Sequence, residues 1–201
     1  MTRQQPEIEA TSAARTVLKL LARPQLTMRN MEWGQSAMIE YRVTKYDPAK
    51  RDARGAYLCA EWTSFKDIGR AIGGAVLTAE EYRRVEQAYV DSALAFVAEG
   101  KLSSLIVEGL ENPEKRPVKV QDGSVCSAEE IGELIRQLLR EEYWCRLEAQ
   151  SGFIHFGWDY YMYIGVPHRC VEAERLSRRM GLYPEEFASP YKRDDEVVTE
   201  G

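Results

Sequence analysis

The chain has 201 residues, 44% of them hydrophobic, and a formal net charge of −5 at pH 7. This length and composition suffice for one domain with a hydrophobic core. Apart from a short cluster of Arg175, Arg178 and Arg179, the sequence lacks the basic footprint of a protein that binds duplex nucleic acid. An acidic surface instead fits a soluble protein, or one that meets a basic partner.

The sequence predicts no metal site, cofactor site or membrane span. The four cysteines lie far apart without a Cys-x-x-Cys pair, and there are only two histidines, so a structural zinc site is not expected. The glycines of GRAIGG do not have the spacing of a dinucleotide-binding fingerprint. No apolar run approaches the roughly 20 residues of a membrane span, and the N-terminus has no signal-peptide pattern. We therefore expect a cytoplasmic protein with no cofactor.

The N-terminal third predicts a helix, a linker and a first hairpin. Apolar residues recur at helical spacing from residue 6 to 22, and helix and linker together occupy residues 1–34. Alternating side chains then predict strands over 38–46 and 56–63. The simplest pairing joins them as an antiparallel hairpin.

Three further helices follow in the chain. Thr78 and Ser127 open capping-box sequences, so helices are expected from these residues to about Glu99 and Leu139. A third helix is expected over 168–180, with Gly181 as the residue that ends it.

This order of elements is typical of an α+β fold. We expect an antiparallel or mixed sheet built from hairpins over 38–63 and 143–164, with amphipathic helices packed on it. The expected single domain covers residues 35–188, and a flexible C-terminal tail covers 189–201.

The stretch 143–164 holds the densest aromatic content. If Ser151 and Gly152 form a two-residue loop, Glu148 lies directly opposite His155. Alternation along the strands then separates an apolar face from a polar one. The apolar face carries Tyr143, Cys145, Leu147, Ala149, Ile154, Phe156, Trp158, Tyr160 and Met162. The polar face carries Trp144, Arg146, Glu148, Gln150, Phe153, His155, Gly157, Asp159, Tyr161 and Tyr163.

This polar face is the candidate site. A carboxylate beside the imidazole would orient it as an acid–base catalyst requires, so His155 and Glu148, with Arg146 as an anion clamp, are the catalytic candidates. Gly157 leaves space for a ligand or another backbone. Cross-strand charge pairing without function, or burial under a helix, would give the same pattern.

The aromatic residues of the same face favour protein binding, because interfaces are enriched in aromatics and arginine. The candidate binding residues are Trp144, Arg146, Phe153, Asp159, Tyr161 and Tyr163. The favoured hypothesis is a small protein-binding module, such as a bacterial immunity-type or antitoxin-type inhibitor that occludes a partner protein. The alternatives are an enzyme using the His155/Glu148 pair and a structural module that self-associates into a homo-oligomer.

Overall fold

The computed structural model describes residues 38–191. The helix and linker expected over 1–34, and residues 192–201 of the expected tail, lie outside the described residues. The strands are β1 (Ile39–Thr44), β2 (Ala71–Ile72), β3 (Ala75–Val76), β4 (Leu105–Glu111), β5 (Val125–Cys126), β6 (Trp144–Ala149), β7 (Gly152–Phe156), β8 (Met162–Val166) and β9 (Tyr183–Glu186). The helices are α2 (Ala79–Glu99), α3 (Ala128–Leu139) and α4 (Val171–Arg179), with short 3₁₀ turns η1 (Pro48–Lys50), η2 (Phe65–Asp67) and η3 (Trp158–Tyr160).

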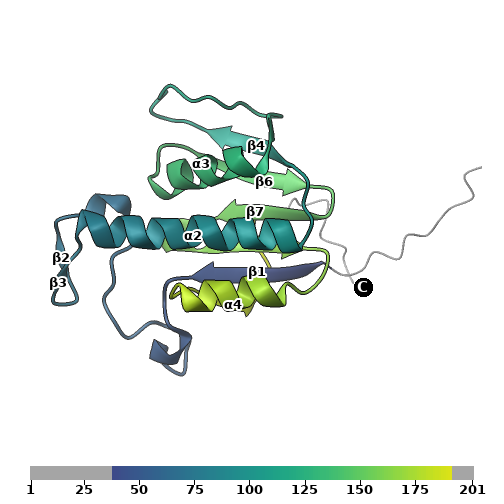
Figure 1. The fold of residues 1–201 in the computed structure, drawn as a ribbon. Helices are drawn as coiled ribbons and strands as arrows, with labels where there is room; N and C mark the ends of the chain where they lie inside the picture. The colour runs from purple at the N-terminus through teal and green to yellow at the C-terminus, as the bar shows by residue number, and fades with distance from the viewer. Residues whose placement is uncertain (1–37, 192–201) are drawn as a thin grey trace, which may run out of the picture. The chain divides into compact units, whose positions relative to one another are not determined.

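Seven of the strands form one sheet in the order β5-β4-β6-β7-β8-β1-β9. Every neighbouring pair in it is antiparallel. The three helices lie across one face of this sheet (Figure 1). The predicted α+β class with an antiparallel sheet is therefore confirmed.

Helices α2 and α3 begin where the sequence places their caps, whereas α4, expected from residue 168, begins at Val171 without a side-chain cap. The Thr78 hydroxyl accepts a hydrogen bond from the Glu81 amide at 3.1 Å, and Ser127 forms a full capping box with Glu130. These contacts satisfy amides that a helix start leaves without a partner. Gly181 follows α4 with a φ of 83°, a left-handed conformation that glycine adopts at low cost.

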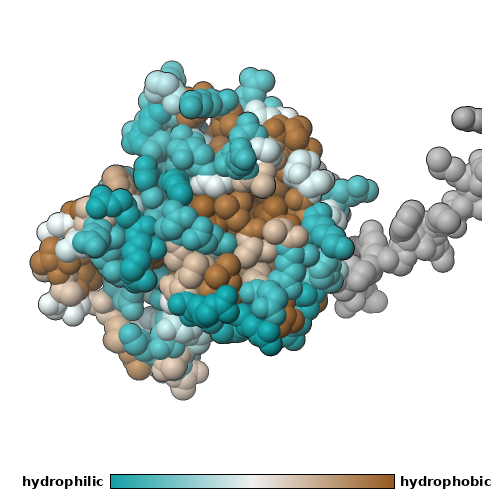
Figure 2. All heavy atoms as spheres, in the orientation of Figure 1, coloured by the Kyte–Doolittle hydropathy of each residue, from teal (hydrophilic) through white to brown (hydrophobic). Residues whose placement is uncertain are grey.

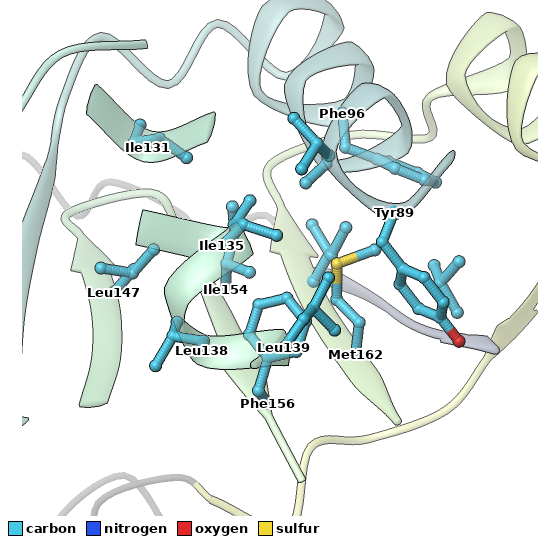
Figure 3. Close-up of a cluster of buried hydrophobic side chains, with 14 of the residues drawn as sticks. Tyr89, Phe96, Ile131, Ile135, Leu138, Leu139, Leu147, Ile154, Phe156 and Met162 are labelled. Carbon is cyan, nitrogen blue, oxygen red and sulfur yellow. The ribbon is translucent and has the colours of Figure 1, made fainter. Parts of the chain in front are cut away.

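The core lies between the helices and the sheet. Tyr89 and Phe96 of α2 and Ile135 of α3 point toward Ile154 and Met162 of the strands (Figure 3). All five side chains are fully buried, and each large side chain removed from water contributes about 1.5–3 kcal/mol. This packing fixes which side of each strand faces the helices.

The expected hairpin over 38–63 is wrong. β1 instead pairs with β8 on one side and β9 on the other. Residues 56–63 contain no strand, and only a single bridge joins Arg51 to Tyr57. An alternating pattern identifies a strand but not the strand with which it pairs. One partner of β1 is β9, which lies in the segment LYPEEF, where no strand was expected.

The hairpin expected over 143–164 is a three-stranded meander, β6-β7-β8. The loop between β6 and β7 is Gln150-Ser151, so Glu148 pairs with Phe153 rather than with His155. This register differs from the expected one by two residues, and because side chains alternate with a period of two, the faces of β6 and β7 are unchanged. The exception beyond β7 is Trp158, which was expected on the apolar face and is 86% exposed.

The β2–β3 hairpin extends from the end of the sheet where α2 begins (Figure 1). It carries hydrophobic side chains on the surface (Figure 2), including Val76, and Leu58 is also exposed. Of the helices within residues 38–191, none has the length and apolar character needed to cross a membrane.

Candidate functional site

The polar sides of β6, β7 and β8 lie on the sheet face opposite the helices, because their neighbours Leu147, Ile154 and Ile164 belong to the helix-covered core. The chain after β9 crosses this face. There the ring of Phe187 lies 6.2 Å from that of Tyr163, and Tyr191 lies 5.8 Å from Tyr163. Residues 189–191, expected to begin a flexible tail, thus pack on the sheet.

His155 is the centre of a hydrogen-bonded group on this face, which we call the His155 cluster: Arg146, Glu148, Phe153, His155 and Ser189. The His155 ring contacts a Glu148 oxygen through Nε2 and the Ser189 hydroxyl through Nδ1, both at 2.8 Å. Since a carboxylate only accepts, Nε2 donates to Glu148, and in the neutral ring Nδ1 accepts from Ser189. Both ring nitrogens are therefore engaged.

The remaining members hold the ring in place. Phe153 stacks on His155 with centroids 4.2 Å apart and planes 11° from parallel. The Arg146 guanidinium lies 3.9 Å from both Glu148 and Glu108, and donates to the Tyr191 carbonyl at 3.3 Å. Glu148 and His155 meet as diagonal neighbours across β6 and β7, a distance that long side chains span.

The cluster has the parts of an acid–base relay but little access. His155 is 1% exposed, and the Ser189 hydroxyl also accepts the Tyr191 amide at 3.2 Å. The space expected above Gly157 is filled by Tyr191, whose hydroxyl lies 2.7 Å from where a Cβ at Gly157 would be. The cluster therefore anchors the C-terminal segment to the sheet.

A cavity of about 520 Å³ opens at the end of the sheet where β7 leads into η3 and α3 ends; we call it the end cavity. Its aromatic wall consists of Tyr143, Trp144, Phe156, Trp158, Tyr160 and Tyr191. Its carboxylates are Glu111, Glu114, Glu141, Glu142 and Asp159. Among the described residues that line it, none is Lys, Arg or His.

The turn that carries Trp158 is held rigidly. Asp159 and Tyr160 have φ angles of 58° and 63°, a left-handed conformation that a bulky residue adopts only under constraint. The Tyr160 hydroxyl donates to the Leu139 carbonyl at 2.9 Å, and the Tyr160 carbonyl accepts from Tyr89 at 2.7 Å. These bonds fix the turn on which the exposed Trp158 stands.

The carboxylates of the end cavity differ in their partners. Glu141 binds Lys66 at 2.7 Å, and Glu114 binds Arg116 at 2.5 Å. Burial acts to raise the pKa of Glu141, but hydrogen bonds from Lys66 and Ser64 outweigh it and lower that pKa. Within residues 38–191, the other three carboxylates, those of Glu111, Glu142 and Asp159, form no ion pair. Burial raises the pKa of the Tyr143 phenol, so this group stays neutral at pH 7.

The structure separates the predicted site residues into three places. Glu148, His155, Arg146 and Phe153 meet in the His155 cluster, and Tyr163 lies buried beside it. Trp144 and Asp159 line the end cavity. Tyr161 packs against Tyr46 and lies 5.5 Å from the Arg42 guanidinium.

Sequence reasoning missed two groups of residues. Ser189 and Tyr191 were placed in the tail, and no local pattern marks a segment that packs on a distant strand. Trp158 was assigned to the apolar face because the alternation was extended through η3. Gly157 and Asp159 are residue types that are common in turns, but the aromatic residues around them are typical of a strand, which the alternation continued.

Comparison of the chain with protein-family models, with curated proteins and with solved structures finds no match. The fold and the two sites therefore define the class: an α+β domain with one face of its sheet under helices and an aromatic, acidic cavity at one end. No group of three metal-binding side chains suited to an ion occurs in the described part of the chain.

Proposed function

We propose that the protein is a binding module that captures another protein through the end of the sheet around Trp158. The observation that supports this most directly is the exposure of Trp158, 86%, on a rigid turn beside the end cavity. A tryptophan is among the residues that dominate binding energy at protein interfaces. Because the turn is held in place before binding, the backbone that carries Trp158 need not be ordered in the complex.

The surface proposed here differs from the one expected from the sequence. The middle of the polar sheet face is occupied by the chain's own residues 187–191, and Phe153 and Tyr163 are buried beneath or beside them. Trp144 and Asp159, at the end of that face, remain available in the end cavity. We therefore propose that the partner binds at the end of the sheet and not on its face.

The proposed partner is a basic protein. The chain has a net charge of −5, and the end cavity carries carboxylates without a lining cation. Complementary charge accelerates association and selects partners. An immunity-type or antitoxin-type inhibitor that occludes its partner is the particular form we propose, acting in the cytoplasm, where the four free cysteines of the described residues would stay reduced.

Catalysis is the second candidate, and one observation favours it: Ser189, His155 and Glu148 are hydrogen-bonded in series. It requires that the 1% exposed His155 reach a substrate. A structural role predicts that His155→Ala changes stability only. Catalysis predicts loss of turnover in a folded variant.

Self-association is the third candidate. The edge strands of the described sheet are β5, with two residues, and β9, with four residues including Pro184. Short edges interrupted by proline offer little backbone for strand pairing. This favours a different protein as the partner over a second copy.

The test compares three forms of the protein as baits for partners in cells of its source. Wild type and Val125→Ser should recover the same partner, because Val125 is exposed but lies on β5, away from the end cavity. Trp158→Ala should lose about 2 kcal/mol or more of binding free energy, which is at least about thirtyfold in Kd. Equal affinity of Trp158→Ala and wild type for the isolated partner would refute the proposal.

A further inference from the structure

We infer that the end cavity is a binding site for an arginine side chain of the partner, with its guanidinium held between the carboxylates and an indole ring. The inference rests on the proposed function and names the chemistry that the site recognises. It starts from two carboxylates in the cavity that interact with a cation only at longer range, Glu142 with Arg140 and Asp159 with Lys45. Glu142 and Asp159 line it and form no ion pair within the described residues.

The aromatic wall supplies the second half of the recognition. Trp144 and Trp158 both line the cavity, and an indole face attracts a cation more strongly than any other aromatic side chain. Guanidinium is planar, so it can stack on an indole while its edge binds a carboxylate through two parallel hydrogen bonds. An ammonium lacks that geometry.

The cavity is large enough to admit an organic cation. Its volume, about 520 Å³, falls in the range of roughly 300–1,000 Å³ of small-ligand sites. The described carboxylates are not grouped closely enough to hold a metal ion. A side chain with an apolar stem and a charged head therefore fits both the aromatic wall and the carboxylates.

The cavity is also formed in advance of binding. The Trp144 indole donates to the Phe156 carbonyl at 2.7 Å, and Tyr160 is bonded to the end of α3 through the Leu139 carbonyl at 2.9 Å. Because Trp144 and the η3 turn are held by such bonds, little reorganisation opposes entry of the side chain.

The first experiment is an NMR titration of the full-length protein that follows the indole N–H signals of Trp144 and Trp158. The ligands are three acetylated pentapeptides: Gly-Gly-Arg-Gly-Gly amide, the same peptide with citrulline, which is the neutral isostere of arginine, and the same peptide with lysine. We expect the arginine peptide to shift both signals with a Kd in the millimolar range. Raising the salt to about 0.5 M, where the Debye length falls to about 4 Å, should weaken this binding.

Two substitutions test the carboxylates without disturbing the turn. Asp159→Asn keeps a residue that tolerates the left-handed conformation, and Glu142→Gln keeps the side-chain shape. Each should raise the Kd of the arginine peptide about two- to fivefold. Glu133→Gln, an exposed change on α3 outside the cavity lining, should leave the Kd unchanged.

Three outcomes would overturn the inference. Equal binding of the citrulline peptide would mean that the cavity recognises shape without charge. Equal or tighter binding of a lysine peptide would remove the assignment to guanidinium. Absence of shifts would remove the cation site, whereas the proposed function would still be decided separately by the loss of partner in Trp158→Ala. The reverse result is also distinguishable. If the arginine peptide binds but Trp158→Ala does not weaken the complex with the partner, the proposed function is refuted and the cation site remains.

Discussion

At the scale of the residue, His155 helps to attach the C-terminal segment to the sheet through Ser189. Replacing it by alanine leaves a cavity beside Phe153 and removes the partner of Glu148 and of Ser189. We expect His155→Ala to lower the free energy of unfolding by about 2–4 kcal/mol, measured by urea denaturation. The exposed His168, in the matching His168→Ala, should change it by less than about 0.5 kcal/mol. If His155→Ala were as stable as the wild type, the stabilising role assigned to the His155 cluster would be contradicted.

Glu174 links stability to pH. It accepts hydrogen bonds from Tyr41 at 3.1 Å, Arg169 at 3.0 Å and Arg178 at 3.1 Å. Burial acts to raise the pKa of this carboxyl, but the bonds from Arg178, Arg169 and Tyr41 outweigh it, so the pKa is lowered. A lowered folded-state pKa stabilises the protein above the unfolded value of about 4.3, and that contribution is lost as the pH falls through the folded value.

The expected effect of Glu174→Gln follows from that sign. At neutral pH the variant should be less stable than wild type by about 1–3 kcal/mol. The difference should shrink as the pH falls below the unfolded-state value of about 4.3 and through the lower folded-state value, because the wild-type carboxyl is then protonated as well. Urea denaturation at several pH values measures this difference. The control is Glu172→Gln, which removes a surface ion pair with Arg175 and should change the free energy of unfolding by under about 1 kcal/mol. A difference that grows toward acid pH would show that the sign is wrong.

At the scale of the element, close contact between β7 and β8 depends on Gly165. A Cβ at this position would clash with the Phe153 ring and the Met38 sulfur. Gly165→Ala should therefore destabilise the protein by about 1–3 kcal/mol. The matched control is Gly132→Ala on α3, where the new Cβ would meet Val90 at an acceptable 3.4 Å and should gain up to about 1 kcal/mol from helix propensity. If both variants were stabilised, or both were destabilised to a similar extent, the close contact assigned to Gly165 would be contradicted.

What the sequence could predict at this scale was set by local chemistry. The helix starts at Thr78 and Ser127 are confirmed because capping depends on residues three positions apart. The faces of β6 and β7 are confirmed because a two-residue change of register conserves alternation. Strand partners depend on contacts between distant segments, so the pairing of β1 with β8 and β9 carried no local signal.

At the scale of the whole molecule, the candidate site was only partly predictable. Glu148 and His155 are in contact as expected, although at a diagonal position. His155 is buried beside Ser189 and Tyr191, which approach from more than thirty positions away in the chain. The end cavity combines β4, α3, β6 and η3 with the C-terminal segment, and no single stretch of sequence contains enough of it to be recognised.

The measurement that tests the account most directly is chemical-shift mapping of the ¹⁵N-labelled protein in complex with its isolated partner. We predict that the largest changes fall at residues 141–144 and 156–160, around the end cavity and Trp158. Changes centred on the His155 cluster, or on the exposed sides of α2 and α4, would place the partner elsewhere and contradict the central claim.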